Sequence, residues 1–144
     1  MMFIGCGTEA SVCQPPETQS DHMLSAPSGV EDINHIGVMH LRFAGNGSTT
    51  YDAIDFSEAS RIVVGQLFDL LIREFRHGIS GSQNDRDVRV VGCRLWDNVV
   101  GYYVNANHPL IVDSRFVGNT TGLGGGIFNT LITSTKFTGN DYGI

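Results

Sequence analysis

The sequence has no long hydrophobic run, and none of its apolar stretches approaches the roughly 18 residues that a membrane-spanning helix needs. Charged residues are also scarce, at 17% of 144 residues, which is less than a helical bundle normally carries. The net charge of -6 argues against nucleic acid as a partner, because phosphate binding needs a basic surface. The start, MMFIGCG, lacks the basic segment and the apolar length of a secretory signal peptide.

Cysteine is too rare to build a disulfide framework, since the chain has only three. Cys6 and Cys13 are close enough in sequence to pair in an oxidising compartment, but spacing alone leaves paired and unpaired states open. Cys93 lies inside a repeated segment, where we expect it to be a small buried hydrophobe.

Glycine, in contrast, is abundant, with 18 residues and no collagen-like period, which is typical of short strands joined by many turns. The C-terminal part repeats itself every 21 residues or so. The repeated positions are an apolar residue, a small one, a basic one, Leu or Phe, and Asn; they fall at Val90, Ile111 and Ile132, at Cys93, Ser114 and Thr135, at Arg94, Arg115 and Lys136, at Leu95, Phe116 and Phe137, and at Asn98, Asn119 and Asn140. Looser copies occur at GVMHLRFAGN (37–46) and DLLIREFRHGI (69–79).

A repeat of this length is too short for a pair of helices but holds three short strands and three turns, which is one coil of a β-solenoid. Stacked coils would place Leu95, Phe116 and Phe137 in one internal column. The asparagines would form a side-chain ladder at a corner, where Asn tolerates the left-handed conformation, and the glycines that follow would supply positive φ. We expect two compensating insertions, TTGLGGG and VNANHP, to protrude at different corners.

The chain divides by pattern into two parts. Residues 1–35 are rich in Pro, Ser, Thr and acids and predict an irregular segment that caps the stack or forms an incomplete coil. Residues 36–144 carry the repeats and end partway through a coil.

With these columns in place, the sequence resembles the right-handed parallel β-helix proteins of the pectate-lyase-like superfamily, whose loose consensus is apolar-x-x-[NST]-x-F-x-x-N-x-x-G-I. Ile111, Ser114, Phe116, Asn119 and Gly126–Ile127 carry the pattern, as do Ile132, Thr135, Phe137, Asn140 and Gly143–Ile144. The tetrads FAGN, FVGN and FTGN also resemble repeats of bacterial adhesins, and LLIREFRHGI is similar to segments of phage tailspikes. The resemblance implies an all-β, right-handed, single-stranded parallel β-helix of about five coils.

The candidate site residues are the basic column of the repeat and the aromatic residues that the repeat does not require. Arg94 and Arg115, with Arg42 and Lys136 in the same column, form a basic stripe that either contacts an acidic sugar or covers apolar surface with its stems. Trp96, Tyr102 and Tyr103 are candidates for a platform on which sugar rings stack, or for packing against a loop or subunit. A glycosidase pair needs two carboxyls about 5–10 Å apart, which adjacent coils can provide, as could Asp97 with a neighbour one coil away.

We expect no metal site and no cofactor, because the histidines are scattered and no acidic column forms. The resemblance implies an extracellular, cell-surface or virion protein that binds a polysaccharide or cell-surface glycan, as an adhesin-like or tailspike-like module. Its further partners would be copies of itself, as a trimer in the tailspike-like case, or additional coils of a longer chain. The alternative is a polysaccharide lyase or glycoside hydrolase with the glycan lying across the helix face; we favour the non-catalytic reading.

Overall fold

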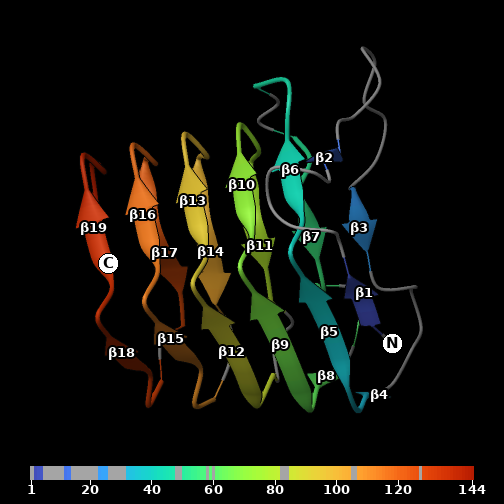
Figure 1. The fold of residues 1–144 in the computed structure, drawn as a ribbon. Helices are drawn as coiled ribbons and strands as arrows, with labels where there is room; N and C mark the ends of the chain where they lie inside the picture. The colour runs from blue at the N-terminus through green and yellow to red at the C-terminus, as the bar shows by residue number, and fades with distance from the viewer. Residues whose placement is uncertain are drawn as a thin grey trace.

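The computed structural model describes residues 2–4, 12–13, 23–25, 32–47, 50–57, 59, 61–81, 85–104, 107–126 and 128–144. Within these residues the protein consists of strands and contains no helix. Every pair of strands is parallel, and the strands are stacked coil upon coil (Figure 1).

Three sheets form the walls of the stack. Sheet A contains, in spatial order, β1 (Met2–Ile4), β5 (Ile36–Met39), β9 (Val64–Phe68), β12 (Asp87–Val91), β15 (Leu110–Val112) and β18 (Leu131–Thr133). Sheet B contains β2 (Val12–Cys13), β6 (Arg42–Ala44), β10 (Leu71–Arg73), β13 (Arg94–Trp96), β16 (Arg115–Val117) and β19 (Lys136–Thr138). Sheet C contains β3 (Leu24–Ser25), β7 (Ile54–Asp55), β11 (His77–Ser80), β14 (Val100–Val104) and β17 (Thr121–Gly125). A short extra pair joins β4 (Asp32–Ile33) to β8 (Arg61–Ile62).

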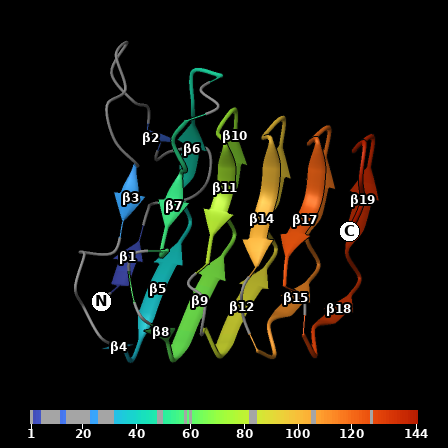
Figure 2. The ribbon, with the colours of Figure 1, turned by 180° about the vertical axis from the view of Figure 1, so that it is seen from behind.

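The path of the chain confirms the predicted parallel β-helix. The chain rises through sheets A and B on one side and descends through sheet C on the other while advancing towards the C-terminus, so the coils are right-handed (Figures 1 and 2). The number of coils differs slightly from the predicted five, because two of the sheets contain six strands.

Part of the difference in coil number comes from residues 1–35, the segment predicted to be irregular, because it contributes strands to the three sheets. The strands β1, β2 and β3 pair with β5, β6 and β7 respectively. Residues 5–11, 14–22 and 26–31 lie outside the described residues. The bond considered between Cys6 and Cys13 also lies outside them, because Cys6 is one of these residues. The division of the chain at residue 35 therefore stays a prediction.

The strand register confirms the columns of the repeat. Leu95 pairs with Phe116 and Phe116 with Phe137, and all three side chains face inward. The rings of Phe116 and Phe137 stack with centroids 4.9 Å apart and planes 12° apart. Cys93 is fully buried, as predicted, and burial raises the pKa of its thiol to about 12.

The asparagine ladder is also present. Oδ1 of Asn119 accepts hydrogen bonds from the backbone N–H (3.0 Å) and from Nδ2 (3.1 Å) of Asn98, and Oδ1 of Asn140 accepts the same two bonds from Asn119, at 3.0 and 2.9 Å. The prediction was wrong about the backbone, because the positive φ belongs to the residue before each Asn, at Asp97 (55°), Gly118 (63°) and Gly139 (65°). The ladder therefore depends on the amide hydrogen bonds alone.

The sequence pattern of a glycine followed by an apolar residue aligns Gly126–Ile127 with Gly101–Tyr102, and this alignment was wrong by four residues. Tyr102 pairs with Leu123, so the residue in register with Gly101 is Gly122 and not Gly126. These glycines have no positive φ; a Cβ on Gly101 would lie 2.7 Å from the ring of Phe116, and one on Gly122 equally close to Phe137. Glycine is required there because the core column approaches the backbone closely.

The expected compensating insertions follow from that misalignment and do not exist as such. Most of TTGLGGG forms strand β17, and beyond β14 and β17 Asn107 and Phe128 form a parallel bridge between the two coils. The 21-residue spacing persists because the two coils stay in register at this corner, where Asn107 pairs with Phe128.

Candidate functional site

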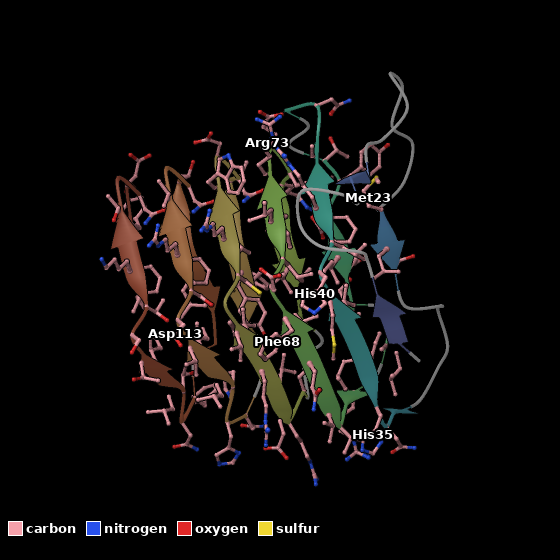
Figure 3. The ribbon with its side chains drawn as sticks, viewed as in Figure 1. Met23, His35, His40, Phe68, Arg73 and Asp113 are labelled. Carbon is pink, nitrogen blue, oxygen red and sulfur yellow. The ribbon has the colours of Figure 1, made fainter. Side chains whose placement is uncertain are left out.

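The three outer faces of the stack differ in chemistry. On sheet A the register aligns Met39, Phe68, Val91 and Val112, so this face carries an apolar column, in which Phe68 is 44% exposed (Figure 3). Sheet B presents basic residues, and sheet C presents His77 and Tyr103. Neighbouring strand residues point to opposite faces, so each outer column flanks a buried one.

The outer face of sheet B brings the predicted basic stripe together. Arg94 pairs with Arg115, and Arg115 pairs with Lys136, so three cationic side chains lie in successive coils. All three are exposed, whereas the neighbouring inward residues Leu95 and Phe116 are fully buried. Arg42 stands in the same column but is separated from Arg94 by the buried Leu71.

Trp96 lies in the second outer column of the same sheet. Its register partners are Arg73 in the preceding coil and Val117 in the following coil. Trp96 is partly exposed and Val117 is 39% exposed, so an indole stands next to the basic stripe. We call the surface formed by Arg94, Trp96, Arg115, Val117 and Lys136 the basic face.

A pocket of about 270 Å³ adjoins the basic face at the corner that follows sheet B. Glu74 and Asp97 line it from adjacent coils, together with Gly47, Phe75, Asn98, Val99, Gly118 and Thr120. The Asp97 carboxylate lies over Gly118, where a Cβ would come within 2.6 Å of Oδ1. Glu74 is in contact with Arg73, whose Nη1 is 3.4 Å from Oε1 (Figure 3 labels Arg73).

The structure separates the two tyrosines from Trp96 and from each other. Tyr102 is fully buried in the core, where burial and the charge of Asp85 raise the pKa of its hydroxyl above the usual range. A ligand outside the coil therefore cannot stack on Tyr102. Tyr103 lies on the outer face of sheet C and is 37% exposed. The predicted aromatic platform is thus divided between two faces.

Tyr103 stands beside a cluster of charged groups that the sequence did not reveal. Asp52 is fully buried, and it accepts hydrogen bonds of 2.8 Å each from Nε and Nη2 of Arg76. The backbone N–H of His77 donates to the same carboxylate (3.2 Å), and Nδ1 of His77 lies 3.1 Å from Oδ1. The ring of His77 stacks on Tyr103, with centroids 5.2 Å apart.

The protonation of Asp52 reflects opposing influences. Burial is the largest and raises the pKa of this carboxyl, but the contacts with His77 and Arg76 together outweigh it. The pKa falls from 3.8 to about 2, and the pairing raises the pKa of the Arg76 guanidinium in turn. At neutral pH Asp52 is therefore a carboxylate, and it holds the start of β11 through the backbone N–H of His77.

This cluster escaped sequence reasoning because its members do not share a repeated column. Asp52 lies in the loop before β7, and the histidines had seemed scattered because their spacing follows no simple motif. The sequence does contain one indication of the cluster, namely the adjacent basic pair Arg76–His77 about one coil after Asp52.

Two further observations concern membrane spans and metal ligands. Within the described residues, no helix is long and apolar enough to cross a bilayer. Across the same residues, no three His, Cys, Asp or Glu side chains are grouped so that they could hold a metal ion.

Comparisons with protein-family models, with curated proteins and with solved structures found no match for this chain. The protein is a parallel β-helix by its strand pairing, whereas membership of the pectate-lyase-like superfamily stays a prediction.

Proposed function

We propose that the protein is a carbohydrate-directed binding module whose basic face binds an acidic polysaccharide lying along the axis of the stack. One observation carries the proposal, namely the register that aligns the exposed Arg94, Arg115 and Lys136 in consecutive coils. Without that alignment, three basic residues in a chain of net charge -6 would be unremarkable surface charges.

The geometry suits a linear polyanion. Neighbouring parallel strands lie about 4.8 Å apart, so the column offers one positive charge per coil at a regular spacing. Like charges this close repel each other, and an anionic chain laid across them relieves that repulsion. Arginine also forms paired hydrogen bonds with carboxylates, which favours uronic acids or similar acidic sugars. Trp96 adds a flat apolar surface beside the stripe for the sugar rings.

Trp96 is the only tryptophan, so its fluorescence reports directly on ligands at this face. A panel of plant and bacterial polysaccharides, acidic and neutral, would be titrated while this signal is followed. The double variant Arg94→Gln/Arg115→Gln should weaken acidic binding by roughly tenfold or more and flatten its dependence on salt. Arg89→Gln, an exposed arginine on sheet A, is the matched control and should bind as the parent does. Equal loss in the control, or none in the double variant, would contradict the proposal.

A polysaccharide lyase or glycoside hydrolase is the second candidate, and the corner pocket favours it. Glu74 and Asp97 occupy successive coils in that pocket, next to the basic face. Adjacent coils can bring two carboxyl groups to the separation of about 5–10 Å that glycosidases use. Incubation with the same panel, followed by assays for reducing ends and for absorbance of unsaturated products, tests this candidate. Cleavage that disappears in Glu74→Gln or Asp97→Asn would establish it, and binding without cleavage would exclude it for that glycan.

An acidic polysaccharide ligand also favours a place outside the cell, as an adhesin-like or tailspike-like module. Fractionation of producing cells, or of virions, with an antibody against the chain tests this part of the proposal. Recovery in the cytoplasm alone would overturn it.

A further inference from the structure

Sheet C carries on its outer face an aromatic stack that continues from one coil to the next. His77 on β11 and Tyr103 on β14 have ring centroids 5.2 Å apart, and their planes differ by 23°. Tyr103 keeps 37% of its surface exposed. Because the imidazole occupies one face of the phenol ring, the exposed area belongs to the other face and the edge.

The following coil has no side chain at the corresponding position. The register places Gly124 of β17 beside Tyr103. A Cβ on Gly124 would lie 3.7 Å from Cδ2 of Tyr103, with Val100 Cγ1 at 3.3 Å and Thr121 Cγ2 at 3.5 Å. We call this position the Tyr103 notch: Tyr103 forms one wall, Val100 and Thr121 flank it, and Gly124 is its floor.

The ring of Tyr103 is supported by His77, which is itself held in place. The backbone N–H of His77 donates to Asp52, Nδ1 of its ring lies 3.1 Å from the same carboxylate, and Asp52 accepts two hydrogen bonds from Arg76. A ring that is already ordered loses little conformational entropy when a ligand stacks on it. The notch is therefore preorganised for a flat partner that extends the stack of His77 and Tyr103.

We propose that the Tyr103 notch is a second glycan site, which takes an uncharged sugar ring stacked on Tyr103 above Gly124. The apolar face of a pyranose suits an aromatic ring, and methyl groups of Val100 and Thr121 flank the position. None of the four residues that form the notch is charged, and the nearby Arg76 guanidinium is engaged by Asp52. The site is thus selective for neutral rings, in contrast to the basic face. A nucleobase would also stack, but the net charge of -6 opposes its phosphates.

The inference rests on the proposed function in assigning glycans as ligands, but it uses another side of the molecule. Sheet C faces away from sheet B, as the two opposite views show (Figures 1 and 2). One molecule therefore binds an acidic chain on one side and a neutral chain on the other, which cross-links the two.

The test is calorimetric titration of the chain with four probes: cellohexaose, mannohexaose, chitohexaose and a ten-residue oligothymidylate. At least one neutral hexasaccharide should bind, with an affinity that salt hardly changes. Tyr103→Ala and Gly124→Val, which fills the notch, should each weaken binding by roughly tenfold, as expected for the loss of one stacked ring. Tyr103→Phe keeps the ring and should stay within about twofold of the parent.

Folding is checked by circular dichroism, and Gly124→Ala replaces the valine variant if the larger side chain lowers the melting temperature. The proposal is overturned if no neutral hexasaccharide binds, if Tyr103→Ala binds like the parent, or if only the oligothymidylate binds. Acidic polysaccharide binding that survives in Tyr103→Ala but is lost in Arg94→Gln/Arg115→Gln would leave the basic face standing while this inference falls.

Discussion

Asp113 turns the chain from β15 into β16 with a φ of 48°. The same corner has a left-handed residue in four other coils, at His40, Asp69, Gly92 and Ser134 (Figure 3 labels His40 and Asp113). Asp, Ser and His are short or polar, and they tolerate this conformation better than branched apolar residues do. The corner therefore selects its residue by backbone conformation, which explains why this column shows no common side chain.

A comparison of two substitutions tests this explanation. Asp113→Val should destabilise the fold by about 1–2 kcal/mol, because a β-branched residue is strained at positive φ. Asp113→Gly, the residue that the column has at Gly92, should be close to neutral. Urea unfolding followed by circular dichroism measures both, and equal stabilities would show that the backbone at this corner relaxes.

Asn119 is the centre of the amide ladder. Its Nδ2 donates to the carbonyl of Leu95 (3.0 Å), and its Oδ1 satisfies the backbone N–H of Asn98. Asn119→Ala leaves these buried groups without partners, and we expect a loss of about 1–3 kcal/mol. Thr120→Ala, at the exposed neighbouring position, is the control and should change stability little. Thermal melts that coincide for Asn119→Ala and the parent would mean that the ladder adds nothing to stability.

At the scale of the strand, β16 shows how one residue connects two coils. Phe116 is fully buried, stacks on Phe137 of β19, and packs beneath Gly101 of β14. Phe116→Ala should cost about 3–5 kcal/mol, because it removes a large side chain from a packed core. Val117→Ala on the same strand removes a partly exposed side chain and should cost under about 1 kcal/mol. Chemical unfolding of the two variants separates the inward from the outward face.

The connection between β7 and β11 depends on charge. The folded-state pKa of Asp52 is about 2, below its usual 3.8, so its carboxylate stabilises the fold at any pH above that usual value. This stabilisation should decline as the pH falls from about 4 towards 2, and its full size should be about 2 kcal/mol. Urea midpoints measured at several pH values in the parent and in Asp52→Asn test the assignment. The variant should lack this part of the acid dependence, and an unchanged pH profile would refute it.

The repeated columns of the strands were predictable from sequence because like residues recur at a fixed spacing. The glycines were not, because glycine has two uses that a sequence does not distinguish. Gly118 provides a positive φ, whereas Gly122 makes room for the ring of Phe137. Matching Gly126–Ile127 to Gly101–Tyr102, as a glycine followed by an apolar residue, shifted the alignment of one coil by four residues.

For the whole molecule, stability should decrease along the stack. The inward residues Ile111 and Phe116 are fully buried, whereas Ile132 and Phe137 of the following coil are only partly buried. We expect backbone amides of β12 and β13 to exchange hydrogen more slowly than those of β18 and β19, because opening free energies follow buried contacts. Uniform protection across all coils of this chain would show that it opens only as a single unit.

The sequence by itself determined the β-helix, the inward columns and the asparagine ladder, and it named Arg94, Arg115, Trp96, Tyr102 and Tyr103 as candidate ligand contacts. These features follow from alternation along a strand and from the stacking of like upon like, both of which are local and periodic. Only the tertiary structure decided which of these residues share a face. It buried Tyr102, separated Trp96 from Tyr103, and joined Asp52 to Arg76 and His77. Such contacts depend on the size of each corner and on the register between coils, which a repeat with irregular loops does not encode in any single stretch of sequence.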